Sequence, residues 1–466
     1  MFIGRTKELT ELERRYAQPG FQFPVIYGRR RIGKTRLLQE FLRGKRAVYF
    51  MATEQSEHEL LAGITQALKE QMPDEHTRYI SSFDTWEELF AYIAELASNG
   101  ERFVLAIDEY PYLAKAKPEI SSLLQKAIDG AWSNTELFLI LCGSSMSFME
   151  KQVLGEKSPL YGRRTGQLKL TPFPYYEGVR FFPDWTKEDQ LLGFGICGGV
   201  PKYLELFARY NSLRDAVLGE FLFPSGHLIE EPDNLMKQEL REPAVYNSIL
   251  SAIAGGATRL NEIAQVVRTE ATKLGFYLGN LRDWGIVEQE KPVGKGGSRH
   301  GIYRFTDDMF SFWFRFMPSC RNLIAMGAAE RAYDGRIVPH LNEWFGYVFE
   351  GICMQYLKLR VGQGKIPELY TDYGRWWGTN PIRKREEEID LVLSDESHLL
   401  VGECKWQNDP VNPSVFRLLE ERAAIIRDGK DLRYVIFAKS GFTKELQSLG
   451  RADLHLIDFD KLFDPV

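Results

Sequence analysis

Residues 23–42, FPVIYGRRRIGKTRLLQEFL, combine a short apolar run, a glycine-containing loop and an amphipathic segment. Residues 23–27 predict a buried strand, and residues 36–42 have the apolar spacing of a helix. The residues from Gly28 to Thr35 match G-x-x-x-x-G-K-[ST], in which glycines let backbone N–H groups curl around phosphate oxygens. The following helix points its positive N-terminus at the same oxygens. The segment therefore predicts a strand, a phosphate-binding loop and a helix in succession.

The loop predicts ATP and Mg²⁺ as ligands. Lys34 is expected to reach the β- and γ-phosphates, and Thr35 to hold Mg²⁺. A glycine turn that happens to precede a lysine is the alternative, but it requires neither the flanking strand nor the helix. The expected nucleotide-binding residues of the loop are Gly28, Arg29, Arg30, Arg31, Ile32, Gly33, Lys34 and Thr35.

A second apolar strand, residues 102–109 (RFVLAIDE), ends in two carboxylates. Nucleoside triphosphatases use an acid at such a strand end to hold the magnesium shell, and a second acid to polarise the attacking water. Asp108 is therefore predicted to be the magnesium partner and Glu109 the catalytic base. A solvated acidic strand end is the alternative.

Polar and basic residues follow further along the chain. A third strand, residues 136–143 (ELFLILCG), leads to Ser144, which we expect to sense the γ-phosphate, although hydroxyls after strands are also common turn formers. Arg163 and Arg164 could neutralise the transferring phosphoryl group, from the same or a neighbouring subunit of a homo-oligomer. For these two arginines a surface ion pair is the alternative.

Composition limits the class of protein. The chain has 466 residues, which at roughly 150 per domain predicts about three domains. Hydrophobic residues at 44% and charged residues at 26% indicate a globular chain, and a net charge of −5 confines any nucleic-acid contact to local patches. The five cysteines are widely spaced without a CxxC pair, and no apolar run reaches the roughly 18 residues that a membrane span needs. We expect a cytoplasmic protein with no membrane partner.

Residues 246–305 predict three short helices followed by a hairpin with a glycine-rich tip, which is typical of a winged helix-turn-helix. The third helix would present Lys273, Tyr277 and Arg282 to a DNA groove. The hairpin contains no acid between positions 291 and 304 and carries Lys291, Lys295, Arg299 and Arg304. DNA is therefore the expected partner. A protein-binding module or a rigid lid remains the alternative.

The last third of the chain carries a second group of reactive side chains. Residues 342–357 predict a helix bearing Glu350, and two strands follow with Asp390 on the first and Glu403 and Lys405 on the second. Side chains alternate along a strand, so Glu403 and Lys405 should project together while Cys404 points to the other face. Asp390 and Glu403 are predicted Mg²⁺ ligands, and Glu350 and Lys405 predicted catalytic groups for phosphodiester hydrolysis. A charged sheet edge or a decayed site are the alternatives. The basic segment before the site, with Arg375, Arg383, Lys384 and Arg385, suits backbone phosphates or a solvated loop.

Residues 1–240 resemble the AAA+/STAND-like P-loop ATPases found mainly in archaea and also in bacteria. The resemblance rests on the opening FIGR, the phosphate loop, LAIDEYPYL (105–113), LCGSS (141–145) and GGVPKYL (198–204). It implies an α/β fold with a parallel P-loop NTPase sheet, an opening segment beside the nucleotide base, and a helical lid that contains the GGxP segment.

Residues 335–466 resemble the PD-(D/E)XK nuclease superfamily, with Glu350 as the helix acid, Asp390 as the central acid and Glu403-Cys404-Lys405 as E-x-K. Ile389 stands where a proline would precede the acid. The segment GRWWG (374–378) also fits a C-terminal domain of unknown function that commonly follows such ATPases. This resemblance implies a mixed α/β restriction-endonuclease-like domain.

Together these patterns predict an ATP-hydrolysing protein whose nucleotide state moves a winged-helix lid and regulates a metal-dependent nuclease. A nucleotide-switched DNA-binding regulator or signalling scaffold with an inactive nuclease-like domain is the alternative. The expected division is a P-loop ATPase domain at 1–180, a helical lid at 181–240, a winged helix-turn-helix at 241–306, a helical linker at 307–340 and a nuclease-like domain at 341–466.

Overall fold

The computed structural model describes residues 2–73, 81–240, 242–294, 301–380 and 383–464. The chain divides into two compact units, one of Met1–Pro172 with Val200–Lys202 and one of Phe173–Gly199 with Tyr203–Val466. Among the helices of the described residues, none is long and apolar enough to cross a membrane.

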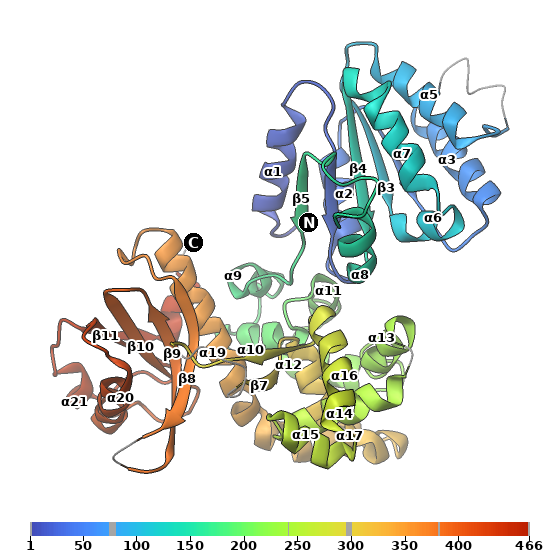
Figure 1. Cartoon of the computed structure of the whole chain (residues 1–466). Coiled ribbons are helices and arrows are strands. Elements are labelled where there is room, and N and C mark those ends of the chain that lie inside the picture. The colour runs from blue at the N-terminus through green and yellow to red at the C-terminus, as the bar shows by residue number, and fades with distance from the viewer. Residues whose placement is uncertain (1, 74–80, 241, 295–300, 381–382, 465–466) are drawn as a thin grey trace. The chain divides into compact units, whose positions relative to one another are not determined.

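The first unit is built on a parallel five-stranded sheet (Figure 1). Its strands follow the order β2-β3-β4-β1-β5. All its neighbouring strands pair in parallel. The order places the ends of β1, β3 and β4 next to one another, and these are the strands that the sequence predicts to carry the phosphate loop, the paired acids and Ser144. The strands are β1 (Pro24–Tyr27), β2 (Ala47–Met51), β3 (Phe103–Asp108), β4 (Leu137–Gly143) and β5 (Gly166–Lys169).

Helices cover both faces of this sheet, which explains why its central strands are apolar throughout. Along β3, Val104 and Ala106 pack in the core that includes Leu37 and Phe41 of α2, whereas Phe103 and Leu105 pack in the opposite core with α3, α5 and α7. The helices are α1 (Thr6–Tyr16), α2 (Lys34–Leu42), α3 (Glu57–Gln71), α5 (Trp86–Ala97), α6 (Tyr110–Ala116), α7 (Ile120–Asp129) and α8 (Met146–Phe148).

The second unit begins with helices, which a small hairpin follows. Its strands β6 (Val287–Glu290) and β7 (Ile302–Phe305) pair in antiparallel fashion directly after a three-helix segment. The long helix α17 (Asp308–Ala325) then buries most of its aromatic side chains, so the aromatic density of this region serves packing. The remaining helices are α9 (Tyr175–Gly178), α10 (Lys187–Cys197), α11 (Pro201–Phe207), α12 (Leu213–Val217), α13 (Glu231–Glu239), α14 (Pro243–Ala254), α15 (Leu260–Val267), α16 (Ala271–Asp283) and α18 (Ala329–Ala332).

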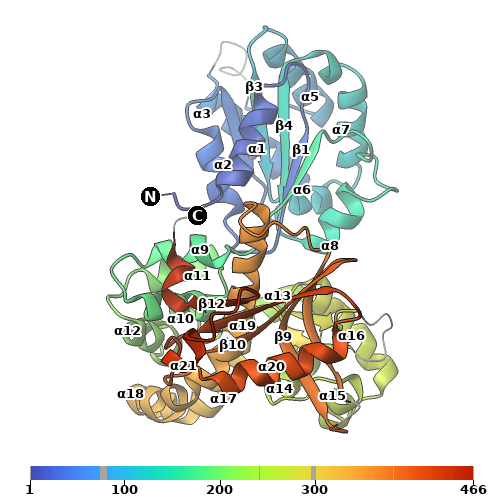
Figure 2. The same cartoon turned by 90° about the vertical axis from the view of Figure 1, so that its left-hand side faces the viewer.

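The C-terminal part of the second unit is a mixed five-stranded sheet in the order β12-β11-β10-β9-β8. Strands β8, β9 and β10 are antiparallel, and β10, β11 and β12 are parallel. Helix α20 packs on one face through Phe416 and Leu419, and α19 lies on the other, where Tyr356 contacts Phe437 (Figure 2). The elements are α19 (Val338–Gly362), β8 (Asp372–Thr379), β9 (Glu386–Ser394), β10 (His398–Lys405), α20 (Pro413–Ile426), β11 (Asp431–Ala438), α21 (Lys444–Gln447) and β12 (Leu454–Asp458).

The architecture confirms the predicted parallel α/β sheet behind the phosphate loop, the helical region and the mixed C-terminal sheet. All five cysteines have free thiols.

Candidate functional site

The phosphate loop joins the end of β1 to the start of α2, as the sequence predicts. The first residue of the loop, Gly28, lies close to the backbone of Leu170, the residue after β5. A Cβ on Gly28 would stand 2.6 Å from the Leu170 carbonyl oxygen. The Lys34 side chain folds back over the loop, where Nζ donates hydrogen bonds to the carbonyl oxygens of Gly28 at 2.9 Å and Arg29 at 3.0 Å. Burial lowers the pKa of the Lys34 ammonium. The loop therefore holds a buried cation ready to exchange carbonyl partners for an anion.

Asp108 is buried at the end of β3 and faces the start of α2. The Thr35 hydroxyl donates to Asp108 Oδ2 at 2.7 Å, and the Tyr49 hydroxyl donates to the same oxygen at 3.0 Å. Burial, followed by the charge of Asp108, raises the pKa of the Tyr49 phenol. Tyr49 lies on β2 and is absent from the sequence prediction. The structure therefore brings together Thr35 and Asp108, the two residues predicted to hold Mg²⁺.

Glu109 is held against the end of β4. The Ser144 hydroxyl donates to Glu109 Oε2 at 2.7 Å, and the Ser144 backbone N–H donates to the same oxygen at 3.3 Å. Ser144, predicted to sense the nucleotide, is therefore hydrogen-bonded to Glu109, predicted to act as the base.

Two further segments of the first unit contact the loop. The Arg5 guanidinium, only 3% exposed, donates to the carbonyl oxygens of Ile32 and Thr171. The Lys202 backbone N–H donates to the Arg31 carbonyl oxygen. The opening segment and residues 200–202, which belong to the first unit, therefore both lie beside the phosphate loop.

The two predicted arginines are engaged elsewhere in this conformation. Arg163 binds Asp129 through both carboxylate oxygens, at 2.7 and 2.6 Å, and Arg164 donates to the Leu154 carbonyl oxygen at 2.8 Å. Arg163 thus makes the ion pair that the sequence left as its alternative.

The C-terminal acids surround Asp390 on β9. The Cys404 backbone N–H donates to Asp390 Oδ2 at 2.9 Å, and Lys405 Nζ lies 2.7 Å from Glu403 Oε1. This contact shows that Glu403 and Lys405 project to the same face, and Glu403 also pairs with Arg422 of α20. Burial raises the pKa values of Asp390 and Glu403, and the charge of Asp390 raises that of Glu403 further.

Glu350 approaches Asp390 from α19, on the other face of the sheet. Burial and then the charge of Asp390 raise the pKa of Glu350. Glu350 and Asp390 line one pocket, whereas Glu403 and Lys405 are not among its lining residues. Asp390 therefore lies between Glu350 on one side and the Glu403–Lys405 pair on the other. Within the described ranges, no group of three or more His, Cys, Asp or Glu side chains is arranged to hold a metal ion.

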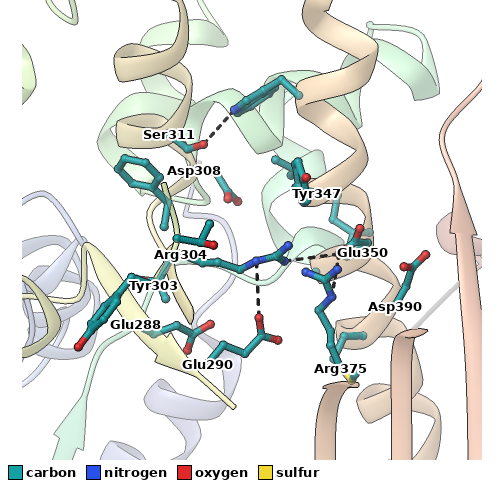
Figure 3. A pocket seen from close by; sticks show the side chains of 18 of the residues that line it. Glu288, Glu290, Tyr303, Arg304, Asp308, Ser311, Tyr347, Glu350, Arg375 and Asp390 are labelled. Carbon is teal, nitrogen blue, oxygen red and sulfur yellow. Dashed lines mark hydrogen bonds and ion pairs between the residues drawn. The ribbon is translucent and has the colours of Figure 1, made fainter. Parts of the chain in front are cut away.

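The predicted hairpin residues are only partly described. Lys295 and Arg299 lie outside the described residues. Arg304 on β7 faces Glu290 on β6 and Glu350 on α19, at 3.7 and 3.8 Å (Figure 3). On α16, Lys273 is exposed and the Tyr277 hydroxyl donates to Glu242 at 2.7 Å.

The fold and loop define a P-loop ATPase, and comparisons with known proteins agree. Residues 2–207 match a family model described as an ATPase domain predominantly from Archaea, and residues 313–423 match one described as archaeal and bacterial proteins of unknown function. The chain is 33% identical over 452 residues to an uncharacterised protein of Methanocaldococcus jannaschii, covering 96% of this chain and 97% of the relative. The chain belongs to this archaeal ATPase family with the C-terminal domain of unknown function.

Two solved structures are similar to the chain. The Walker-type ATPase of Pyrococcus abyssi is 21% identical with a TM-score of 0.52, and the match covers 67% of this chain and 96% of that chain. The ORC2 protein of Aeropyrum pernix is 14% identical with a TM-score of 0.41, and the match covers 70% of this chain and 95% of that chain.

Proposed function

We propose that this protein hydrolyses ATP at the phosphate loop and couples its nucleotide state to DNA binding and metal-dependent phosphodiester cleavage by its C-terminal domain. The observation that carries the first part is the 2.7 Å contact between the hydroxyl of Thr35, the residue that follows Lys34, and the buried Asp108 carboxylate. These hard oxygen donors suit Mg²⁺, which neutralises charge on the β- and γ-phosphate oxygens.

The chain's own groups would perform the remaining work. The backbone N–H groups of residues 28–35 and the Lys34 ammonium would orient the phosphates. Glu109 would accept the proton of the attacking water as the bond between the γ-phosphorus and its leaving oxygen breaks. Its hydrogen bond to Ser144 at 2.7 Å supports this role, because it directs one carboxylate oxygen while the other can face water.

Substitution of Glu109 by glutamine tests the base. The amide keeps the size of the side chain and can still accept from Ser144, so ATP binding should persist while phosphate release falls roughly a hundredfold. Phosphate release and titration calorimetry with ATP measure the two effects separately. The exposed Glu101→Gln variant is the control and should hydrolyse ATP normally. Unchanged turnover in Glu109→Gln would remove Glu109 from the reaction.

Phosphodiester cleavage is supported by the carboxylates around Asp390. Asp390 and Glu403 are 7% and 5% exposed, and burying several carboxylates together is costly unless a cation compensates them. Glu350 Oε2 receives no hydrogen bond within the described chain and lies 3.4 Å from Arg375 Nε, so its charge is balanced at present by a guanidinium that a hard cation could replace. Asp390 and Glu403 would hold Mg²⁺, and Lys405 would orient the water and stabilise the developing phosphate charge.

Nicking of supercoiled plasmid tests this second site. The wild-type chain should nick plasmid with Mn²⁺ or Mg²⁺ and not with EDTA, and Lys405→Met should slow nicking about a hundredfold. Lys439→Met is the matched control, because Lys439 binds Asn408 and Glu188 outside the cluster. Equal nicking by wild type and Lys405→Met would refute the assignment. A wild-type chain that binds DNA without nicking it would favour the nucleotide-switched regulator or scaffold.

A further inference from the structure

A polar pocket of about 790 Å³ lies within the second unit, where the β6–β7 hairpin meets α19 and the edge of the C-terminal sheet (Figure 3). We call it the hairpin pocket and define it by Glu290, Arg304, Tyr347, Glu350, Arg375 and Asp390. The hairpin is fixed there because the Val293 backbone N–H donates to the Arg375 carbonyl oxygen at 2.9 Å, and the Val293 side chain packs against the core of the sheet. Elements that are distant in sequence thus build one pocket.

Arg375 is the feature of this pocket that points to an anion. The residue is only 7% exposed, and its Nε and Nη1 have no hydrogen-bond partner within the described chain. Its Nε lies 3.4 Å from Glu350 Oε2, and its Nη2 lies 3.3 Å from Glu388 Oε2. A buried guanidinium with unfilled donors is suited to an acceptor with several oxygens, and phosphate meets this geometry with two parallel hydrogen bonds.

Arg304 brings a second guanidinium to the same carboxylate. Its Nη1 lies 3.8 Å from Glu350 Oε2 and its Nε lies 3.7 Å from Glu290 Oε2, so both contacts exceed hydrogen-bond length. The guanidinium also stands 4.9 Å from the ring centroid of Tyr347, whose residue is 61% exposed. The pocket therefore combines two cations with an accessible aromatic ring, which is the combination that binds unpaired nucleotides.

We propose that the hairpin pocket binds single-stranded nucleic acid, with a backbone phosphate on Arg304 and Arg375 and a base stacked on Tyr347. This deepens the function proposed above, because it names the class of nucleic acid that reaches Glu350 and Asp390. A pocket of this volume accepts a ligand of one or two nucleotides, so a duplex such as supercoiled plasmid would enter it at positions where its strands are locally unpaired. Acidic side chains also line the pocket, so phosphate would enter together with the divalent cation that Asp390 holds, which also attracts Glu350 and frees the two arginines.

The test measures fluorescence anisotropy of the full chain with a labelled strand of twelve thymidines, in Ca²⁺ and in EDTA. We expect the strand to bind at least about tenfold more tightly than its duplex with twelve adenosines, and Ca²⁺ to strengthen the binding. Arg304→Gln and Tyr347→Ala should each weaken single-strand binding about tenfold. Arg331→Gln, which alters an exposed arginine outside the pocket, is the control and should bind as wild type does. A uridine strand in parallel distinguishes RNA from DNA.

The outcomes separate this inference from the proposed cleavage. Equal affinity for strand and duplex, with no loss in Arg304→Gln or Tyr347→Ala, would overturn the inference. Nicking of duplex plasmid that Arg304→Gln leaves unchanged would also overturn it while the cleavage site stands. Tight binding that depends on Arg304, with no cleavage in Mn²⁺, would support the pocket and remove the nuclease. Circular dichroism of each variant checks that it folds.

Discussion

Replacing Lys34 with alanine is expected to slow ATP hydrolysis about a thousandfold, because it removes the cation that would face the β- and γ-phosphates. In the structure this ammonium is buried and is held by two loop carbonyl oxygens, at 2.9 and 3.0 Å. The substitution removes a buried charge that pays a desolvation cost, so folding should not suffer. Loss of activity in Lys34→Ala would therefore report on catalysis.

Phosphate release and binding of a fluorescent ATP analogue measure the effect, with thermal unfolding as the folding check. Lys151→Ala is a suitable control, because Lys151 is an exposed lysine of the same unit. A Lys34→Ala protein that turned over ATP at the wild-type rate would show that another part of the chain binds the phosphates.

Replacing Gly199 with alanine is expected to destabilise the second unit by about 4 kcal/mol, from backbone strain and steric overlap together. Gly199 has a φ of +66°, and a Cβ there would stand 2.4 Å from the Phe173 carbonyl oxygen and 3.1 Å from Phe194 Cε2. The left-handed backbone costs an L-residue about 1–2 kcal/mol, and relieving the overlap with a backbone oxygen costs about 1–3 kcal/mol more. The GGxP segment therefore needs its second glycine for steric reasons.

Gly285→Ala isolates the backbone contribution to this effect. Gly285 has a φ of +73° with no atom within 4 Å of the added Cβ, so its substitution should cost only about 1–2 kcal/mol. Scanning calorimetry of the full chain should show a fall of about 10 °C in one unfolding transition for Gly199→Ala, and a much smaller fall for Gly285→Ala. Equal shifts would mean that the contact with Phe173 relaxes freely.

Local patterns were sufficient to predict the phosphate loop and its neighbours. The strand before Gly28, the helix from Lys34 and the acids at the end of β3 each follow from a short run of residues, and they meet because the ends of parallel strands share one edge of the sheet. Tyr49 was not predicted as a site residue, because β2 is a short strand and its alternating pattern does not show whether a tyrosine points toward the site or toward solvent.

The C-terminal site was harder to predict because its parts meet through tertiary pairing. The alternation of β10 correctly separates Glu403 and Lys405 from Cys404, but it does not tell which face α19 covers. Arg304 looked like a wing residue directed at DNA, since sequence shows its basic neighbours and not Glu350, which lies 46 positions away. Only the docking of the hairpin on β8 reveals this contact.

The packing of Val293 against the C-terminal sheet limits where the chain can be truncated. A fragment cut at residue 341, where the last predicted domain begins, would lose both this anchor and Arg304, one of the guanidinium groups beside Glu350. Removing one partner of a buried charge cluster leaves the other uncompensated. The smallest fragment that keeps the groups around Glu350 and Asp390 must therefore begin before the β6–β7 hairpin. A boundary at residue 341, drawn from the sequence, would separate the hairpin from the sheet on which it packs.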